Sequence, residues 1–563
     1  MLNITQYLTF RLAYLKYSYL LQNTAMKSFQ SFFTQFPNSF IQNGKHKISY
    51  VDFFRHSQNL QKAFAFYGIA QGEILAIVSQ PCIEWILCDV ACIKSQIVTI
   101  PLFHNSSSQT LTFQFQDAKP QHIILENDEV LEKILACVEY KFSNIFLIHK
   151  SKKFPEIKTI WQIIEEHHEV ELLNHEISQS EVATIIYTSG TSGSPKGVVL
   201  TFLNLAHQIS DIHTAFFNAK EGHTAISILP LAHVYQRTII HFFLSKGVNI
   251  IFVNDITNVL RYITKIEPNL ITIVPRVLEK VYSKIKSQIE DKPRMLRKLL
   301  LPLFEIASSN PQPNMLARTI LEATIFKKVR RIFGRNMACI VCGGAKLNER
   351  EEIFFRNAKL PFFQGYGMTE CSPVIASNIT TDDKIFTVGK PFSSVEVCIS
   401  EVGEICVRGG SIFSGYLNHE KRNPQEFFHT GDLGKLNSDG FLSVTGRLKD
   451  QCKNANGKFV DIVKIEGLLN EISGVENSCV IAEGKPYTVA ILFTQRTDFE
   501  AIMKAMHDIN SKLEHWERVQ YIHTTIEKPT VENGIITPSM KIRRNDIVKK
   551  YCVEIEGLYS KKR

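Results

Sequence analysis

Short apolar segments alternate with helical segments over most of this chain, and that alternation limits its possible folds more than any other feature. Phe53, Leu60 and Phe64 recur at helical spacing before Gly68, and residues 74–78 then form a run typical of a buried strand. Similar strand-like runs follow at residues 98–101, 122–125, 144–148, 184–187, 225–229, 248–253, 270–274 and 338–341. Strands that alternate with helices predict parallel sheets covered by helices, so the expected fold class is α/β.

The pattern changes after about residue 382. Short strands with turn signals are expected at residues 404–407, 431–433 and 441–445, which indicates a small β subdomain. From residue 446 a new α+β pattern begins, with a helix at 464–472 and strands at 478–482 and 488–493. We therefore predict a leader at 1–25, a large N-terminal domain at 26–446 and a smaller C-terminal domain at 447–563.

Composition excludes several classes of protein. Of the 563 residues, 44% are hydrophobic and 21% charged, which is ordinary for a soluble globular protein, and no apolar run is long enough to cross a bilayer. The 64 Lys and Arg against 55 Asp and Glu leave a net charge of +9 without a long basic block, so nucleic acid binding is not indicated. The twelve cysteines are scattered and no signal peptide is visible, which favours a reduced, cytoplasmic compartment.

Two features leave alternatives open. The first 25 residues are rich in Leu and Tyr, with Arg11, Lys16 and no acidic residue, so they suit either a basic amphipathic helix on the inner face of a membrane or a packed leader helix. Cys339 and Cys342 form a C-x-x-C pair, but no second cysteine pair stands at zinc-ligand spacing. We expect no metal or redox role for this pair.

The strongest local signal is a loop rich in glycine and hydroxyl groups directly after a predicted strand. Between Tyr187 and Gly197 it carries Thr188, Ser189, Gly190, Thr191, Ser192, Gly193 and Lys196. Glycines let the backbone approach a ligand, hydroxyls donate hydrogen bonds and a lysine supplies positive charge, a combination that suits a polyphosphate. It is not a Walker A loop, because Pro195 precedes the lysine and Gly197 follows it.

With this loop the chain resembles the adenylate-forming superfamily, which includes acyl-CoA synthetases. Further matching segments follow in the family's order, at residues 229–237 (LPLAHVYQR), 342–345 (CGGA), 364–370 (QGYGMTE), 403–405 (GEI), 429–432 (HTGD), 446–450 (GRLKD) and 537–541 (TPSMK). The first of these, and the ending from Glu532 to Lys541, look like the long-chain fatty acyl synthetases. The resemblance covers roughly residues 30–550 and implies a large domain of two α/β layers plus a β subdomain, followed by a mobile C-terminal domain.

The resemblance also implies roles for residues of the matching segments. It implies that Glu370 and Thr188 hold Mg²⁺, that Lys196 binds the triphosphate and that His233 faces the acyl site. Asp432 and Arg447 would contact the ribose, and Lys541 would stabilise charge in the adenylation transition state. The remaining implied nucleotide contacts are Gly343, Gly344, Ala345, Gly365, Tyr366, Gly367 and Thr369.

Without the resemblance, each of these side chains has a simpler interpretation. Tyr366 could be a core tyrosine, Glu370 a solvated carboxylate and Asp432 a turn-forming residue. Arg447 could form an ion pair at a domain edge, and His233 could be a satisfied core histidine. Lys541 lies near Arg543, Arg544, Lys549 and Lys550, a composition typical of a solvated basic face.

The function that the resemblance implies is ATP- and Mg²⁺-dependent activation of a medium- or long-chain fatty acid through an acyl-adenylate, with transfer to coenzyme A. The C-terminal domain would rotate about Lys449 between the two steps. The family often has Asn-Val-x-Pro after Gly457, where this chain has residues 458–461 (KFVD), so the thiol side departs from the pattern. Transfer to an acyl carrier protein is the alternative, and an inactive lipid-binding protein of the same fold is a third. An amino-acid adenylation module fits less well because no carrier domain follows.

Overall fold

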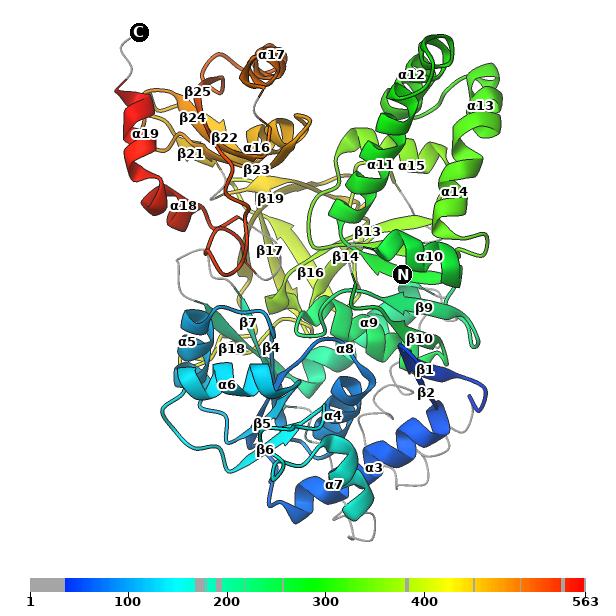
Figure 1. Cartoon of the computed structure of the whole chain (residues 1–563), viewed down its shortest axis with the longest axis vertical. Coiled ribbons are helices and arrows are strands. Elements are labelled where there is room, and N and C mark those ends of the chain that lie inside the picture. Colours follow the sequence, from blue (N-terminus) through cyan, green and yellow to red (C-terminus); the bar gives the residue numbers. More distant parts are fainter. Residues whose placement is uncertain are drawn as a thin grey trace.

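The structure is a computed structural model, and it describes residues 36–167, 178, 180–188, 195–216, 218–255, 258–379, 384–448, 451–496, 498–537 and 542–560. The expected leader at 1–25 lies outside these residues. Figure 1 shows the C-terminal elements, coloured orange to red, gathered at the opposite end of the molecule from β5, β6 and α7. Among the helices of the described segments, none has the length and apolarity that a bilayer crossing requires.

Two large sheets form the N-terminal part, and the first has nine strands. In spatial order they are β15 (Lys390–Pro391), β14 (Val374–Ser377), β13 (Phe362–Gly367), β12 (Cys339–Cys342), β11 (Leu270–Ile273), β9 (Thr224–Ser227), β10 (Asn249–Phe252), β1 (Phe40–Asn43) and β2 (His46–Ser49). From β13 to β1 neighbouring strands run parallel, and antiparallel strands close both edges. The sheet therefore has the predicted parallel centre.

The second sheet has seven strands and, like the first, a parallel centre. In spatial order they are β18 (Gly415–Tyr416), β8 (Lys196–Thr201), β7 (Val182–Thr188), β4 (Val98–Leu102), β3 (Ile74–Val78), β5 (His122–Leu125) and β6 (Asn144–Leu147). The strands from β7 to β6 run parallel, whereas β8 and β18 are antiparallel additions at one edge. The strands predicted from apolar runs are confirmed, most with bounds within two residues.

Helices cover both faces of each sheet. The bounds are α3 (Tyr50–Phe66), α4 (Ile83–Lys94), α5 (Ser108–Ala118), α6 (Asp128–Cys137), α7 (Ile160–Glu166), α8 (Phe202–Ala215), α9 (Val234–Ser245), α10 (Val259–Ile266), α11 (Pro275–Glu290), α12 (Arg294–Ser309), α13 (Met315–Leu321), the π-helix η1 (Glu322–Phe326), α14 (Lys327–Phe333) and α15 (Glu349–Asn357). The predicted first helix is confirmed as α3, which begins after Ser49, whose hydroxyl accepts the amide hydrogen of Asp52 at 3.0 Å.

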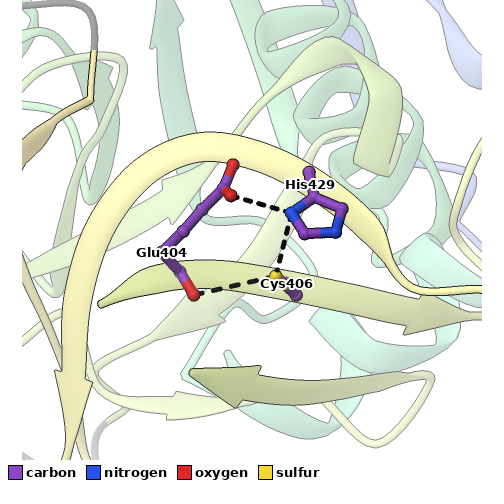
Figure 2. Close-up of side chains that lie close together, drawn as sticks. All are labelled: Glu404, Cys406 and His429. Atoms are coloured by element: carbon purple, nitrogen blue, oxygen red, sulfur yellow. Dashed lines mark hydrogen bonds and ion pairs between the residues drawn. The ribbon is translucent and has the colours of Figure 1, made fainter. Parts of the chain in front are cut away.

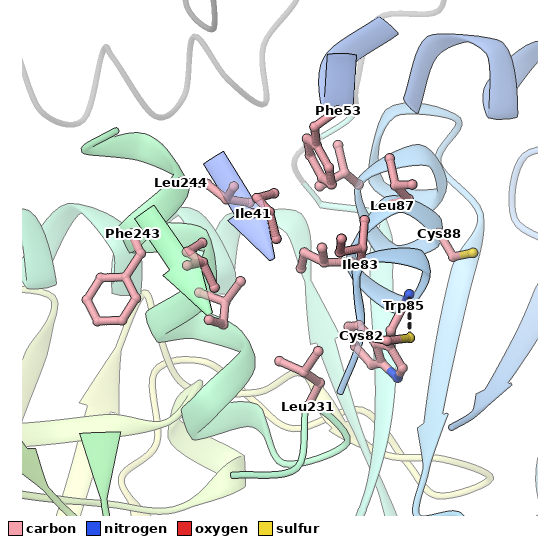
Figure 3. Packing of buried hydrophobic residues seen from close by; sticks show 14 of the residues in the cluster. Ile41, Phe53, Cys82, Ile83, Trp85, Leu87, Cys88, Leu231, Phe243 and Leu244 are labelled. Atoms are coloured by element: carbon pink, nitrogen blue, oxygen red, sulfur yellow. Dashed lines mark hydrogen bonds between the residues drawn. The ribbon is translucent and has the colours of Figure 1, made fainter. Parts of the chain in front are cut away.

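The main core fills the space between the two sheets. It unites Ile41 of β1 with Phe53 of α3, Trp85 of α4 and Phe243 of α9, all buried (Figure 3). Because side chains alternate along a strand, the opposite faces form separate cores. One packs beneath α10 to α15 and the other beneath α5 and α6. The result is a five-layer arrangement in which helices and sheets alternate, in agreement with the expected α/β class.

The C-x-x-C pair spans β12, and its two cysteines face opposite sides of the sheet. Cys339 belongs to the core between the two sheets, and Cys342 to the core beneath α10 to α15. Both thiols are free and buried, and burial raises the pKa of Cys339 to about 12. Their orientation does not bring the two sulfurs to a shared ligand.

A four-stranded antiparallel sheet forms the β subdomain. Its order is β16 (Val395–Ile399), β17 (Glu404–Gly409), β19 (Phe428–Leu436) and β20 (Leu442–Arg447). The C-terminal part holds the hairpin of β21 (Gln451–Lys453) and β22 (Phe459–Asp461), the sheet of β23 (Val475–Ile481), β24 (Thr488–Thr494) and β25 (Val519–Thr525), and the helices α16 (Ile462–Asn470), α17 (Phe499–Asn510), α18 (Arg544–Lys550) and α19 (Cys552–Tyr559). The change of pattern predicted after residue 382 and the α+β pattern predicted from residue 446 are both present.

The C-terminal part touches the large domain at polar contacts. Arg276 of α11 donates to the backbone carbonyl of Glu476 at 3.4 Å, and Asn348 donates to the Glu471 carboxylate at 3.1 Å. Acidic side chains gather at the same place, since Glu279 and Glu471 both help to raise the pKa of Glu351. Within the described residues the hydrophobic clusters of the two parts are separate, so these contacts join the parts through hydrogen bonds.

Candidate functional site

The predicted polyphosphate loop connects two paired strands. β7 ends at Thr188 and β8 begins at Lys196, and these two residues lie directly opposite each other in the antiparallel ladder. The strand before the loop was predicted, whereas β8 was not. Ser189, Gly190, Thr191, Ser192 and Gly193 lie outside the described residues. The hairpin therefore brings Thr188 and Lys196 together at the base of the loop.

Tyr416 connects Lys196 to Glu370, although the three residues are far apart in sequence. β18 pairs with β8 so that Tyr416 lies opposite Val198, two residues from Lys196. The Lys196 ammonium lies 4.9 Å from the centre of the Tyr416 ring, and the Tyr416 hydroxyl donates to Glu370 Oε1 at 2.9 Å. Tyr416 was not predicted, because only the pairing of β18 with β8 places it here.

Glu370 is a buried carboxylate whose surroundings act on its pKa in opposite directions. It lies in the short helix η2 (Thr369–Cys371), just after β13. Burial raises its pKa above the usual value, while the Tyr416 hydrogen bond and the positive charges of Arg447 and Lys196 oppose that rise. The interpretation of Glu370 as a solvated surface residue is therefore wrong. A buried carboxylate oxygen beside cationic groups is a hard ligand of the kind Mg²⁺ takes, so the residues present fit this metal.

Asp432, Arg447 and Tyr366 form a second polar group. The pairing of β19 with β20 places Asp432 opposite Arg447, and Arg447 Nε lies 2.8 Å from Asp432 Oδ1. The Tyr366 hydroxyl donates to Asp432 Oδ2 at 2.7 Å, and the Asp432 side chain is only 4% exposed. The Tyr366 ring packs beside a hydrophobic cluster. Both oxygens of this carboxylate are thus engaged, which holds it in one orientation.

Backbone packing explains two of the candidate glycines. A Cβ on Gly367 would lie 1.8 Å from the backbone oxygen of Pro373, so any side chain there would clash with the backbone just before β14. A Cβ on Gly343 would lie 3.2 Å from the ring of Tyr235. Gly344 and Ala345 follow β12 and are exposed, while Gly365 is half-buried in β13 and Thr369 is half-buried at the start of η2. Packing therefore requires glycine at position 367, whatever ligand the region binds, whereas a side chain at position 343 would need the Tyr235 ring to shift by a few tenths of an ångström.

The segment at 229–237 provides a helix start and a structural ion pair. His233 is the N-cap of α9, and its Nδ1 accepts the backbone hydrogen of Tyr235 at 3.3 Å. Arg237 is buried, and its Nε donates to Asp89 at 2.8 Å. Asp89 also accepts from His241. The sequence did not identify Asp89, because a buried acid within an apolar helix pattern gives no local signal of its partner.

Besides residues 189–193 of the loop, one more candidate has no described position. Lys541 lies outside the described residues, between Thr537 and the half-buried Ile542. The structure otherwise gathers Thr188, Lys196 and Glu370 in one group, and Tyr366, Asp432 and Arg447 in another. The charge of Arg447 acts on Glu370, which links the two groups. Together they offer anion-binding and cation-binding side chains in one region, an arrangement suited to a metal-bound phosphate ester.

The chain matches two family models. Residues 29–417 match the AMP-binding enzyme family, and residues 449–563 match the AMP-binding enzyme C-terminal domain. Among curated proteins, it is 28% identical over 536 residues to the long-chain-fatty-acid–CoA ligase FadD15 of Mycobacterium bovis, covering 88% of this chain and 89% of that protein. It is 32% identical over 431 residues to fatty acyl-CoA synthetase B of Dictyostelium discoideum, covering 68% of this chain and 63% of that protein.

Solved structures show the same fold. The adenylation domain of the carboxylate reductase GR01_22995 from Mycobacterium chelonae superposes with a TM-score of 0.78 at 16% identity, covering 97% of this chain and 93% of that chain. The large N-terminal domain with its separate C-terminal part is therefore an established architecture, in agreement with the fold that the resemblance implied.

Proposed function

This chain belongs to the AMP-binding enzymes, and from that premise we propose that it activates a medium- or long-chain fatty acid with ATP and transfers the acyl group to coenzyme A. The proposal is supported by relatives whose names describe fatty acid–CoA ligases and by the preserved family segments. The observation that carries it is the Tyr416 bridge, which joins Lys196 to Glu370 beside the Asp432–Arg447 pair.

The first half-reaction joins the fatty carboxylate to the nucleotide. A carboxylate oxygen forms a bond to the α-phosphorus of ATP, and the bond from that phosphorus to the bridging oxygen of pyrophosphate breaks. Lys196 and the hydroxyl groups of its loop bind the leaving pyrophosphate. Asp432 accepts hydrogen bonds from the ribose hydroxyls, while Arg447 and Tyr366 hold its orientation. Positioning and charge neutralisation supply most of the rate in reactions of this kind.

Mg²⁺, which Glu370 and Thr188 would hold, neutralises phosphate charge when it is bound. Lys541 is proposed to stabilise the charge that develops between the carboxylate and the α-phosphate. In the second half-reaction the coenzyme A thiol loses its proton and its sulfur bonds to the acyl carbon, and the bond from that carbon to the AMP oxygen breaks. AMP leaves with the electron pair. We assign residues 26–446 and 447–563 to two domains, with Lys449 as the pivot between the two steps.

Pyrophosphate release tests the proposal directly. The purified full chain, given Mg²⁺ and ATP, should release pyrophosphate with saturated carboxylates of about C8 to C20 and should form a thioester when coenzyme A is added. A matched assay replaces coenzyme A with an acyl carrier protein carrying its thiol. The absence of AMP with every carboxylate would contradict the function, whereas a thioester only on the carrier protein would contradict coenzyme A as acceptor.

Lys541→Ala separates the two half-reactions. It should lower acyl-adenylate formation by about 10²- to 10³-fold, yet leave thioester formation from supplied acyl-adenylate nearly unchanged. Lys549→Ala is the matched control, because it removes a nearby lysine outside the family segment. Equal loss of both half-reactions would contradict the proposed role of Lys541.

We further propose that the enzyme contacts a lipid surface through α12 and α13. Met295 and Leu299 of α12 and Met315 of α13 are exposed, at 86%, 56% and 88%. Arg297 and Lys298 stand among them and are also exposed. Apolar side chains mixed with basic ones suit an anionic membrane surface, where the apolar groups enter the interface and the cations meet headgroups. The expected contact through residues 1–25 stays a prediction.

A further inference from the structure

Three strands of the β subdomain place metal-binding side chains in a row. Cys398 of β16 lies opposite Cys406 of β17, and Cys406 lies opposite His429 of β19. Residues directly opposite in adjacent strands point to the same face of a sheet. Ile405 and Val407 alternate with Cys406 along β17 and pack into the core on the other face. The row therefore stands on the face of the sheet that turns away from this core.

Glu404 completes the group, because it lies two residues before Cys406 and so shares its face. His429 Nδ1 lies 2.7 Å from Glu404 Oε2 and 3.4 Å from Cys406 Sγ. The three donor atoms all lie within 4.8 Å of one another. Figure 2 shows the imidazole nitrogen facing both the carboxylate and the sulfur. One carboxylate, one thiol and one imidazole thus converge on a single small region.

We propose that Glu404, Cys406 and His429 form a binding site for Zn²⁺. Sulfur, imidazole nitrogen and carboxylate oxygen are the three donor types that proteins use for this ion. A tetrahedral zinc ion with ordinary bond lengths separates its nitrogen and sulfur ligands by about 3.5 Å and its nitrogen and oxygen ligands by about 3.3 Å. The first separation is already present, and the second requires a shift of roughly half an ångström.

The surroundings allow this shift and give the ion a route of entry. The His429 side chain is 66% exposed, so its ring can move by a fraction of an ångström without disturbing a core. Glu404 and Cys406 are buried and hold fixed positions on β17. Binding replaces the thiol proton of Cys406 with the metal and releases that proton to solvent. The fourth position of the tetrahedron faces solvent and takes a water molecule.

The site is directly connected to the strand that carries Asp432. Glu404 uses its second oxygen, Oε1, to accept the backbone hydrogen of Gly431 at 2.8 Å. Thr430 Oγ1, in turn, accepts the backbone hydrogen of Asp432 at 3.1 Å and donates to the carbonyl of Ile405. Glu404 and His429 therefore both contact the turn at residues 429–432, and a metal ion that moves either side chain would also shift this turn. The consequence for nucleotide affinity rests on the proposed function, whereas the metal site does not.

Cobalt substitution tests the site in the full-length protein. Co²⁺ occupies zinc sites and shows a thiolate-to-cobalt charge-transfer absorption only when a cysteine sulfur binds it. We expect one equivalent of Co²⁺ to produce this band in the presence of excess Mg²⁺, which avoids sulfur ligands, and we expect one equivalent of Zn²⁺ to abolish it. Cys552→Ser is the matched control, since Cys552 is an exposed free cysteine at the start of α19.

Cys406→Ser should remove the charge-transfer band, and His429→Gln should weaken Co²⁺ binding by about 100-fold or more. Thermal unfolding of each variant checks that it is folded. The two substitutions lie on different strands, so if one variant fails to fold, the other still tests the site. A band that persists in folded Cys406→Ser, or the absence of any band in the unmodified protein, would overturn the proposal. In that case the contacts of His429 and Glu404 serve only to brace the turn.

The coupling to nucleotide is measured separately. AMP titrated against the unmodified protein should give a dissociation constant that changes at least threefold between Zn²⁺-loaded and chelator-treated samples, and His429→Gln should not show this change. If AMP does not bind at all, the proposed function fails while the cobalt experiment still decides the metal site. If AMP binds equally well in both samples, the coupling is absent.

Discussion

Tyr416 donates its phenolic hydrogen to Glu370 across 2.9 Å while its ring faces the Lys196 ammonium at 4.9 Å. One side chain from a two-residue strand thus contacts both the proposed metal-holding carboxylate and the proposed phosphate-binding lysine. This relationship allows the hydroxyl to be tested apart from the ring, since phenylalanine keeps the aromatic face.

Removing the Tyr416 hydroxyl should weaken the proposed binding of Mg²⁺ by Glu370. The hydrogen bond lowers the pKa of a carboxyl that burial raises, so Tyr416→Phe should move that pKa further upward. We expect the acidic limb of the pH–rate profile to shift to higher pH, and the Mg²⁺ concentration for half-maximal rate to rise by about 3- to 10-fold, equivalent to a hydrogen bond of roughly 0.5–1.5 kcal/mol. Initial rates of pyrophosphate release at several pH values measure both.

The control for that variant is Tyr487→Phe, which removes a hydroxyl that donates to the carbonyl of Leu558 in the C-terminal part. It should leave the Mg²⁺ dependence unchanged. An unaltered Mg²⁺ dependence in Tyr416→Phe would show that the contact does not support metal binding.

Asp432→Asn should weaken nucleotide binding more than acid binding. The substitution retains the shape of the side chain but removes the charge that pairs with Arg447 and accepts from Tyr366. Hydrogen bonds to charged groups contribute roughly 1.5–3 kcal/mol, so kcat/KM for ATP should fall by about 10- to 100-fold. The KM for the fatty acid should change little. Asp439→Asn, in an exposed turn of the same sheet, is the control, and equal losses for both substrates would contradict a ribose contact.

Breaking the Arg237–Asp89 pair should destabilise the fold. Burial tends to raise the pKa of Asp89, yet Arg237 and His241 outweigh it and hold that pKa below its usual value. The pair therefore stabilises the protein at pH values above the usual aspartate pKa. This stabilisation is lost as the pH falls through the lowered pKa of Asp89 in the folded protein. Arg237→Met removes the bidentate partner of a buried carboxylate that then keeps its contact with His241, and it should lower the free energy of unfolding by about 3–5 kcal/mol.

Denaturant unfolding near neutral pH measures this loss. The double variant Asp89→Leu with Arg237→Met should recover part of it, because no uncompensated charge remains. A double variant less stable than the unmodified protein by the full sum of the two single changes would contradict a direct pairing.

Glu351 should make the stability depend on alkaline pH. Burial first, then the carboxylates of Glu279 and Glu471, raises the pKa of Glu351 to about 8. The folded protein therefore holds a proton that the unfolded chain releases near the usual pKa of glutamate. Between that value and pH 8 the folded state loses stability as the pH rises, and above pH 8 the full loss is present. Glu351→Gln should remove it.

We expect Glu351→Gln to raise the free energy of unfolding by about 1–3 kcal/mol at pH 9 and to have little effect at pH 5. Denaturant unfolding at both pH values measures the difference. Glu349→Gln, an exposed position on the same helix, is the control. A gain of the same size at pH 5 and pH 9 would rule out titration of Glu351 as the cause.

Membrane contact through α12 and α13 should depend on their apolar side chains. Leu316 of α13 is another exposed leucine, beside Met315. Leu299→Glu combined with Leu316→Glu should weaken binding to vesicles of mixed neutral and anionic lipid by about tenfold or more, since each leucine buried in the lipid contributes roughly 1.5–3 kcal/mol. Co-sedimentation at two salt concentrations measures this binding. Val553→Glu changes another exposed apolar side chain, on α19, and should not affect it. Equal binding by both variants would contradict the proposed surface.

The sequence was sufficient to predict those elements whose physical signal lies within one short segment. The parallel strands from β3 to β12 were predicted because a strand buried on both faces requires an uninterrupted apolar run. The short antiparallel strands β8, β14 and β18 lack such runs and were not predicted. Lys196, Glu370 and Asp432 were predicted as site residues because each lies in a segment typical of the family, and the structure places them near one another.

Tertiary structure alone decided which side chains meet. Tyr416 reaches Glu370 only because β18 pairs with β8, and Arg447 meets Asp432 only through the register of β19 and β20. The sequence determined the fold class and the chemistry available, because apolar periodicity and residue type are properties of short segments. It did not determine the contacts between segments, since strand register depends on the packing of the whole sheet.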